Sequence, residues 1–392
     1  MIGSFNFSVL PKIIFGKGKS AELPKLIKGY GDNIILVTGK ESFQNNPEGE
    51  KIVASLKDNG ITANPVVVTG EPSPAIVDKT ARFFREKEID CVVAIGGGSV
   101  MDAGKAISAM IPDEGVVEDY LEGRGDKKHS GRKIPFIAVP TTAGTGSETT
   151  KNAVLSMVGP EGFKASLRHD NFVPEIALVD PMLTLTCPPD ITAASGMDCF
   201  TQLVESYIST EASPFTDALA QEGLKAVKKS LVTSYEDGTD VDARTGMSFA
   251  AMVSGICLAN AGLGIVHGFA SPIGARFNIP HGVICGTLMG AANEVNVKRL
   301  RATPGCEAAL IKYARLGLLF TGKRDGASKE DYVDAFIVYL NKLVERFKLP
   351  KLARYGIAND HIYDILKRAD CKNNPVRLSP ADIKEIFMKR YK

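Results

Sequence analysis

The feature of the sequence that most limits its fold is a change of pattern near residue 188. Before that point, short apolar runs rich in β-branched residues alternate with helical stretches such as AIVDKTARFFREKEI. Near-continuous apolar strands separated by helices are typical of a parallel sheet that is covered on both faces. The apolar runs are NIILVTG (33–39), PVVVTG (65–70), CVVAIGGGS (91–99), KIPFIAVPTT (133–142) and NFVPEIALVDP (171–181).

After residue 188 the sequence has no convincing strand pattern. Segments such as FTDALAQEGLKAVKKSL and EDYVDAFIVYLNKLVERF carry apolar residues at helical spacing instead. A chain of 392 residues is long enough for two domains, each with its own core. The sequence therefore predicts an α/β domain over residues 1–187 and an all-helical domain over residues 188–392, divided near the Pro188–Pro189 pair.

Charge and composition narrow the classes of partner that we expect. The formal net charge is +2, which gives no electrostatic basis for binding nucleic acid. The start, MIGSFNFSVL, lacks the basic and apolar regions of a signal peptide, and no apolar run approaches the roughly 20 residues that span a bilayer. Seven scattered cysteines without a CxxC pair suggest reduced thiols. We expect a cytoplasmic protein that binds neither nucleic acid nor membrane.

The segment AIGGGSVMDAGKA (94–106) places three glycines between a buried strand and a helix. Glycines let the backbone approach an anion closely, and a helix N-terminus presents N–H groups with a favourable dipole. This pattern favours a pyrophosphate site, and the alternative is a tight strand-to-helix turn without a ligand. Asp102, in the first turn of that helix, either complements the helix dipole or faces the ligand.

A second loop, PTTAGTGSETT (140–150), directly follows a predicted strand and is rich in hydroxyl groups and glycine. Such a loop offers donors to phosphate and ribose oxygens. It lacks the GK[ST] ending of a P-loop, so we do not expect hydrolysis of nucleoside triphosphates. Two phosphate-binding turns on one parallel sheet indicate a dinucleotide across the carboxyl ends of the strands.

An acid and two histidines in apolar surroundings suggest a metal site. Asp198 lies one helical turn before Gln202, so both side chains share one helix face. His267 and His281 are each followed by glycine inside an apolar stretch, where a histidine can also be a satisfied core residue. Together with Asp198 they supply oxygen and nitrogen donors suited to Zn²⁺ or Fe²⁺. The remaining histidines lie among charged residues and are expected to be exposed: His129, His169 and His361.

Five motifs follow one another along the chain: GGGSVMDAGK, PTTAGTGSE, VDP (179–181), GMD (196–198) and the HG…PHG pair. Their combination resembles the iron-containing (group III) alcohol dehydrogenases, and the similarity runs from KIIFGKG (12–18) to NNPVRLS (373–379). The resemblance implies a Rossmann-like dinucleotide-binding domain and a helical metal-bearing domain, the architecture shared with dehydroquinate synthase. It also implies hydride transfer between NAD(P)(H) and a small alcohol or aldehyde in the cleft between the domains.

The resemblance further implies which residues contact the cofactor. It places the glycine-rich turn at the pyrophosphate, through Gly96, Gly97, Gly98 and Ser99. The family contacts the cofactor at further positions, which here are Asp102, Thr141, Thr142, Thr145, Ser147, Lys164 and Leu183, and Asn152 falls where the family contacts cofactor or substrate.

The metal and proton-relay positions depart from the family in part. The family holds its metal, Fe or another divalent ion such as Zn, with four residues, which here are Asp198, Gln202, His267 and His281. Gln202 stands where the resemblance implies a histidine. The retained ligands Asp198, His267 and His281 would form the catalytic group. A family histidine thought to relay protons falls on Ser271, which leaves the source of the proton open. Gln202 lies one helical turn after the retained ligand Asp198, and Ser271 lies one turn after the retained ligand His267.

Two other functions stay open beside a metal-assisted alcohol dehydrogenase. Related polyol dehydrogenases use an Asp-His-His set, so three ligands are compatible with metal-assisted chemistry. The alternatives are a metal-independent reductase of the maleylacetate reductase kind and a non-catalytic nucleotide-binding relative. An enzyme of the dehydroquinate synthase kind is less favoured because PTTAGTGSE matches the alcohol dehydrogenases better. We also expect a homodimer.

The end of the strand at 33–39 bears on the choice between NAD and NADP. NAD-specific relatives tend to carry an acid where this chain has Gly39 and Lys40. An acid there hydrogen-bonds the ribose 2′-hydroxyl and repels a 2′-phosphate. We therefore expect Gly39 to lie at the cofactor and NADP(H) to be preferred, although Glu41 adds an opposing charge.

Overall fold

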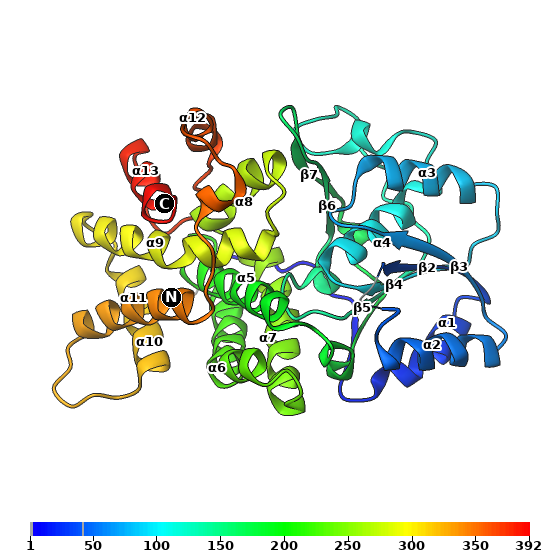
Figure 1. The fold of residues 1–392 in the computed structure, drawn as a ribbon, viewed down its shortest axis with the longest axis horizontal. Coiled ribbons are helices and arrows are strands. Elements are labelled where there is room, and N and C mark those ends of the chain that lie inside the picture. Colours follow the sequence, from blue (N-terminus) through cyan, green and yellow to red (C-terminus); the bar gives the residue numbers. More distant parts are fainter. Residues whose placement is uncertain (1–2, 41–42) are drawn as a thin grey trace.

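The computed structural model describes residues 3–40 and 43–392, which form two domains lying side by side (Figure 1). The first domain, drawn in blue to green, contains all the strands of the described residues. The second, drawn in green to red, is helical. The predicted fold class, an α/β domain followed by an all-helical domain, is confirmed. Glu41 lies outside the described residues.

The α/β domain is built on a six-stranded parallel sheet with the strand order β1-β8-β5-β4-β2-β3. Each predicted apolar run overlaps one of its strands, whereas β1 was not predicted. The strands are β1 (Lys12–Phe15), β2 (Asn33–Gly39), β3 (Thr62–Val68), β4 (Cys91–Gly96), β5 (Phe136–Pro140) and β8 (Ile176–Val179).

Helices cover both faces of this sheet, as its continuous apolar strands require. Along β2, Ile35 and Val37 pack in the core that includes α3 and α4, whereas Ile34 and Leu36 pack in the core that includes α1 and α2. Figure 1 shows the two helix pairs on opposite sides of the strands. The helices are α1 (Leu23–Lys28), α2 (Pro47–Asp58), α3 (Pro74–Phe84) and α4 (Gly98–Met110).

An antiparallel hairpin, β6 (Asn152–Met157) and β7 (Phe163–Arg168), was not predicted from the sequence. Its strands carry small and polar residues rather than a continuous β-branched run, so the strand pattern is weak. In its turn, the Gly159 N–H donates to the carbonyl oxygen of Ala275 in α8 of the helical domain at 3.1 Å. The hairpin therefore connects the two domains.

Residues 188–392 contain helices and no strand, as predicted. The predicted division between the domains falls in the segment between the end of β8 and the start of α5. The helices are α5 (Pro189–Ile208), α6 (Pro214–Glu236), α7 (Val241–Ala261), α8 (Ile265–Arg276), α9 (His281–Ala302), α10 (Glu307–Thr321), α11 (Lys329–Arg346), α12 (Asn359–Arg368) and α13 (Pro380–Lys389).

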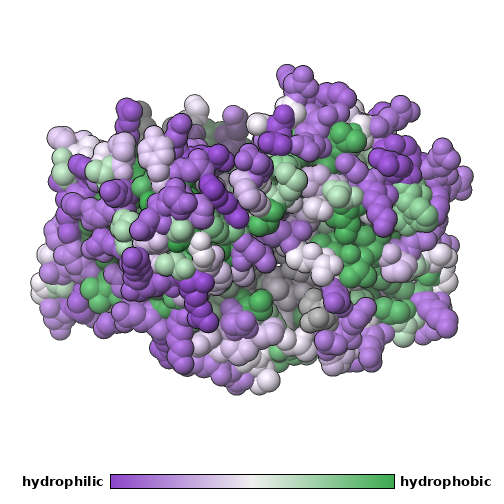
Figure 2. All heavy atoms as spheres, turned by 45° about the horizontal axis from the view of Figure 1, so that its top comes forward, coloured by the Kyte–Doolittle hydropathy of each residue, from purple (hydrophilic) through white to green (hydrophobic). Residues whose placement is uncertain are grey.

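Hydrophilic side chains cover most of the face drawn in Figure 2, on both domains, and a hydrophobic patch lies on the side of the α/β domain. Within the described ranges, no single helix is long and apolar enough to cross a bilayer. Only α7 and α8 taken together have the required length and composition, and they are bent by 99° relative to each other.

The expectation that His129 is exposed was wrong. Its side chain is only 2% exposed, and its ring packs edge-on against Phe172 with the centroids 4.9 Å apart. Its Nε2 lies 3.2 Å from the carbonyl oxygen of Ala109, and its Nδ1 accepts a hydrogen bond from the Gly131 N–H. The prediction relied on the charged residues next to His129 in the sequence. In the folded chain, Ala109 and Phe172 contact the ring and contribute to its burial.

The loop between β5 and β6 joins the two domains by close backbone contact. Gly146 has a left-handed φ of 64°, and a Cβ atom there would lie 2.5 Å from the carbonyl oxygen of Ala251 in α7. A Cβ at Gly255 of α7 would lie 2.1 Å from the carbonyl oxygen of Gly146. The Thr149 hydroxyl donates to the carbonyl oxygen of Met252 at 3.2 Å. Glycine on both sides is what lets the loop dock on α7.

Lys105 of α4 anchors the other side of this loop. Its amine is buried and donates to the carbonyl oxygens of Ser147 and Asn152, both at 2.9 Å, and to the Thr150 hydroxyl at 3.1 Å. Burial lowers the pKa of Lys105 to about 8. One side chain thus fixes the loop onto the first helix that follows the glycine-rich turn.

Glu148, in the same loop, makes the stability of the fold sensitive to pH. It is 2% exposed, and burial raises its pKa from 4.5 to about 7, although Lys105 opposes this rise. Between pH 4.5 and 7 the folded state therefore binds more protons than the unfolded state. Its stability must fall as the pH rises through this window.

We predict that Glu148→Gln removes this fall, because glutamine does not titrate. The free energy of unfolding of the unmodified protein should drop by up to about 3 kcal/mol between pH 4.5 and 7.5 through this group, and the variant should lack that drop. Urea unfolding at the two pH values measures it. Glu161→Gln, at an exposed glutamate, should behave like the unmodified protein. A variant with an unchanged pH dependence would contradict the assignment.

Candidate active site

A cavity of about 510 Å³ lies between the two domains. On one side it is lined by the start of α4, the loop after β5 and the β6–β7 hairpin, and on the other by residues of α5, α7 and α8 and by the loop after α12. The residues that line the cavity include Glu71, Gly98, Ser147, Lys164, Gln202, His267, Ser271, His281 and Lys372.

The glycine-rich turn and the second loop lie against each other at one end of this cavity. Gly97 is the N-cap of α4 in an extended conformation, and a Cβ there would lie 3.3 Å from the Thr142 hydroxyl oxygen. A Cβ at Gly98 would lie 2.8 Å from the Thr145 hydroxyl oxygen. The absence of side chains at both positions leaves the N-terminus of α4 accessible to an anion.

The structure brings only part of the predicted cofactor residues to the cavity. Those that line it are Gly98, Ser99, Asp102, Thr145, Ser147, Asn152 and Lys164. Those that do not line it are Gly39, Gly96, Gly97, Thr141, Thr142 and Leu183. Leu183 is buried in the core, and its carbonyl oxygen accepts a hydrogen bond from Asn46 at 3.1 Å. Gly39 is the last residue of β2.

Asp102 links the loop after β5 to strand β6, and both segments line the cavity. The Ser147 hydroxyl donates to its Oδ1 at 2.5 Å, and the Val154 N–H of β6 donates to its Oδ2 at 3.0 Å. Burial raises the pKa of Asp102, although Lys105 and these hydrogen bonds oppose the rise. Asp102 therefore does more than complement the helix dipole, since it ties the loop to the hairpin.

Lys164 enters the cavity as one half of an ion pair that the sequence did not reveal. Its Nζ lies 2.9 Å from Oε2 of Glu71, in the loop after β3. Burial alone would raise the pKa of Glu71, but the charge and hydrogen bond of Lys164, together with smaller contributions from His281 and Ser156, lower it. The pairing neutralises the lysine charge within the cavity.

At the other end of the cavity, three polar side chains share one buried face of α5. Asp198, Gln202 and Glu205 are 1%, 2% and 4% exposed, and their spacing of four and three residues places them in line. Glu205 was not singled out from the sequence, although the same helical spacing extends to it. A row of polar groups in an apolar helix face is stable only with partners.

Glu205 fixes the orientation of His267. Its Oε2 lies 2.6 Å from Nδ1 of His267, and its Oε1 accepts a hydrogen bond from the Val266 N–H at 2.7 Å. Burial disfavours the charged ring, yet the neighbouring Cys285, Asp198 and Glu205 raise the pKa of His267 well above its usual value. The Nε2 atom is left facing Asp198 Oδ1 at 3.3 Å. A carboxylate on Nδ1 is the usual support of a histidine that binds metal through Nε2.

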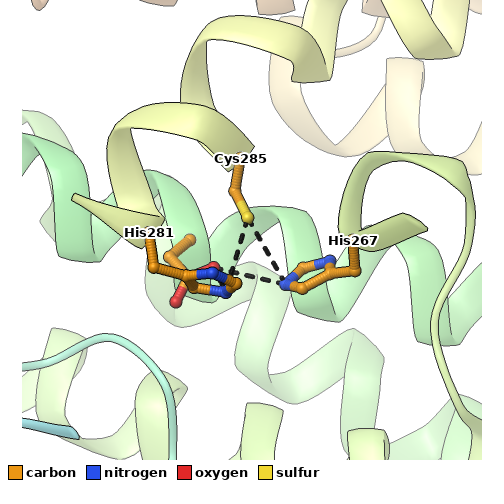
Figure 3. A group of neighbouring side chains, drawn as sticks. His267, His281 and Cys285 are labelled. Atoms are coloured by element: carbon orange, nitrogen blue, oxygen red, sulfur yellow. Dashed lines mark hydrogen bonds and ion pairs between the residues drawn. The ribbon is translucent and has the colours of Figure 1, made fainter. Parts of the chain in front are cut away.

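His281 and Cys285 complete the cluster from α9. His281 Nε2 lies 3.6 Å from Asp198 Oδ1, and burial lowers the pKa of His281 to about 4, so the ring is neutral at pH 7. Cys285 Sγ lies 3.6 Å from Nε2 of both His267 and His281. Figure 3 shows the two rings and the sulfur turned toward one another. Cys285 was not predicted, although it lies one helical turn after His281.

A divalent metal ion fits this cluster. Ligand atoms of Asp198, His267, His281 and Cys285 all lie within 4.8 Å of one another. Asp198 Oδ1 is buried and has no hydrogen-bond partner among the described residues. A buried carboxylate oxygen is costly without a partner, and a cation held by oxygen, nitrogen and sulfur donors would supply one.

The two positions that depart from the family, Gln202 and Ser271, both line the cavity. The Gln202 amide nitrogen is 3.5 Å from Asp198 Oδ2, and its oxygen accepts a hydrogen bond from the Ser254 hydroxyl at 3.3 Å. Since a carboxylate only accepts, the amide N–H group is the one that faces Asp198. Ser271 is exposed and lines the cavity.

Two relatives of known activity resemble the chain over almost its whole length. Alcohol dehydrogenase 4 of Saccharomyces cerevisiae (strain YJM789) is 31% identical over 392 residues and covers 98% of both chains. The NADPH-dependent butanol dehydrogenase of Clostridium saccharobutylicum is 31% identical over 392 residues, covering 97% of this chain and 96% of its own. The crystal structure of 1,3-propanediol oxidoreductase is 27% identical, with a TM-score of 0.88 over 99% of this chain and 100% of the other.

Family models account for both domains. The one described as iron-containing alcohol dehydrogenase matches residues 11–181, and the one for the C-terminal part of the Fe-containing alcohol dehydrogenase family matches residues 192–391. These matches and the identity with the relatives bear out the resemblance seen in the sequence. The chain belongs to the iron-containing alcohol dehydrogenase family and is an NAD(P)-dependent alcohol dehydrogenase.

Proposed function

We propose that the cavity between the domains is where this chain reduces a small aldehyde with NADPH, or oxidises the alcohol in the reverse direction, with a divalent metal held by Asp198, His267 and His281. The observation that carries the proposal is that one cavity joins the glycine-rich turn at one end to the buried metal-ligand cluster at the other. Membership of the family implies the nicotinamide cofactor and a divalent metal, and leaves the choice of each open.

The residues of the chain have separate tasks in this reaction. The N-terminus of α4 and the hydroxyl groups of the second loop would bind the cofactor phosphates. When bound, the nicotinamide supplies the hydride and the metal ion polarises the carbonyl oxygen. Glu205 holds His267 in the tautomer whose Nε2 faces the cluster. Ser271 and Lys372 both line the cavity near this cluster, and each carries a proton that a product oxygen can accept.

The buried state of Asp198 favours a metal-assisted reaction over the metal-independent alternative. Its Oδ1 atom is aimed at His267 and His281 but has no hydrogen-bond partner among the described residues. In a metal-free reductase this buried oxygen would have only the two imidazole rings beside it, at 3.3 and 3.6 Å, and no hydrogen bond from them. The homodimer and the cytoplasmic location expected from the sequence stay predictions.

The preference for NADPH is supported by the end of β2. Gly39 is the last residue of β2, and the exposed Lys40 follows it. Neither residue can repel a 2′-phosphate, and Lys40 adds a cation. The related butanol dehydrogenase is named for its use of NADPH.

We predict that Gly97→Val raises the dissociation constant of the cofactor at least about tenfold, equivalent to ~1.4 kcal/mol. The branched side chain would fill the space between the N-terminus of α4 and Thr142. The change in the fluorescence of NADPH on binding, or calorimetry, measures the affinity. Ala54→Val, at an exposed position of α2, serves as the control. Unchanged affinity in a folded Gly97→Val protein would show that the turn is only structural.

Gly39→Asp should shift the preference from NADPH toward NADH. The new carboxylate would repel the 2′-phosphate and hydrogen-bond the free ribose hydroxyl, changing the ratio of the two kcat/KM values by at least about tenfold. Steady-state kinetics with both cofactors measures the ratio. The proposal of NADPH fails if the unmodified protein uses NADH equally well or better.

His281→Ala should remove both bound metal and activity. With one of three supporting ligands lost, kcat/KM should fall on the order of 100-fold or more. Elemental analysis of the purified protein and aldehyde-dependent oxidation of NADPH provide the two readouts. His361→Ala, on α12, is the matched control. Full activity of His281→Ala without metal would favour the metal-independent reductase instead.

A further inference from the structure

We propose that the thiolate of Cys285 is the fourth protein ligand of the metal ion, in place of the histidine that the family carries at the position of Gln202. The resulting set of one oxygen, two nitrogens and one sulfur would select Zn²⁺ over Fe²⁺. Because the proposed function also needs a metal at this site, this assignment rests on it for the presence of the ion and adds the ligand and the metal.

Four distances between ligand atoms of the cluster match edges of a tetrahedral zinc site. With zinc bonds of about 2.0–2.2 Å to nitrogen and oxygen and about 2.3 Å to sulfur, the N–O edges are about 3.4 Å and the S–N edges about 3.6 Å. The observed N–O separations from Asp198 are 3.3 Å to His267 and 3.6 Å to His281. Both S–N separations from Cys285 are 3.6 Å. Four of the six edges therefore already have about the length that zinc requires, and the other two, between the two Nε2 atoms and between sulfur and the carboxylate oxygen, lie within 4.8 Å.

Cys285 reaches the cluster from a rigid, buried position. It is 0% exposed and lies in α9, one turn after His281, so both side chains leave the same helix face. Its sulfur contacts the two imidazole nitrogens that also face Asp198. A thiol placed only to fill the core would not need to lie equally close to both Nε2 atoms and beside a buried oxygen without a partner.

Gln202 has a different role in this arrangement. Its amide nitrogen faces Oδ2 of Asp198, and its oxygen is directed to the Ser254 hydroxyl. The amide therefore orients the carboxylate by one oxygen and leaves Oδ1 facing the metal position. The missing nitrogen ligand at 202 is compensated from another helix rather than by the glutamine itself.

A thiolate changes the chemistry of the site in a definite direction. On metal binding the S–H bond of Cys285 breaks, its proton leaves to solvent and a sulfur–metal bond forms. Soft sulfur donors favour zinc, and zinc also binds more tightly than ferrous iron in sites of this kind. Asp198 and Cys285 together balance the two positive charges of the ion, whereas three histidines with one aspartate leave one charge unbalanced.

The test compares metal binding in the full-length protein with that of Cys285→Ser and Cys285→Ala, with circular dichroism to check folding. The unmodified protein, expressed with both metals supplied, should contain zinc. After exchange to Co²⁺ it should show the thiolate-to-cobalt charge-transfer absorption in the near ultraviolet. Both variants should lack this absorption and bind zinc at least about 100-fold more weakly, as measured by competition with a chelating dye.

Two further variants make the result specific. Cys257→Ala removes another fully buried thiol, in α7, and should keep both the absorption and the zinc affinity. The double variant Gln202→His/Cys285→Ala should regain zinc affinity through a nitrogen donor, without the sulfur absorption.

The assignment is overturned if the cobalt-loaded protein lacks the thiolate absorption, if it binds no metal, or if Cys285→Ala keeps the affinity of the unmodified protein. Activity separates this assignment from the proposed function. A protein that binds zinc through sulfur but reduces no aldehyde supports the ligand and contradicts the function. An active metalloprotein without a sulfur ligand supports the proposed function and contradicts the assignment of Cys285 as a ligand.

Discussion

The buried carboxylate of Asp198 is the group on which the rest of the site depends. Burial alone would raise its pKa, but His281 and His267 beside it lower the pKa to about 2, so the group remains charged. A charge buried to this depth costs several kcal/mol unless its surroundings satisfy it. The Gln202 amide donates to the carboxylate oxygen Oδ2. The other oxygen, Oδ1, has no hydrogen-bond partner among the described residues and would be satisfied by a cation. Helices α5, α8 and α9, which share one apolar core, bring the side chains of the cluster to this point.

The loop after β5 holds the α/β domain against the helical domain that carries this cluster. Lys105 fixes the loop after β5 to α4, and paired glycines, Gly146 and Gly255, allow the same loop to touch α7 backbone to backbone. The loop is therefore bonded to both domains, with the cofactor end of the cavity on one side and the cluster on the other. A fixed distance between the two ends is what hydride transfer requires.

The fold could be predicted in outline because hydrophobic periodicity is a local property. Hairpin β6–β7 was not predicted because its strands carry small and polar residues instead of a continuous apolar run. The burial of His129 was not predicted because it depends on contacts with residues that are distant in the sequence. Asp198, His267 and His281 are brought together as the resemblance implied. Cys285 could not be assigned until the start of α9 at His281 was known, since only then does one helical turn separate the two. Leu183 lies in the core, and its contact with the cofactor, which the resemblance implies, stays a prediction.

The most direct test of the central claim is a crystal structure of the purified protein with anomalous diffraction data collected on both sides of the zinc absorption edge. The account predicts a zinc peak bonded to Asp198 Oδ1, to Nε2 of His267 and His281, and to Cys285 Sγ at about 2.3 Å. Gln202 should keep its amide nitrogen toward Asp198. A peak with the Gln202 oxygen in place of the sulfur, or no anomalous scatterer between these residues, would contradict the account.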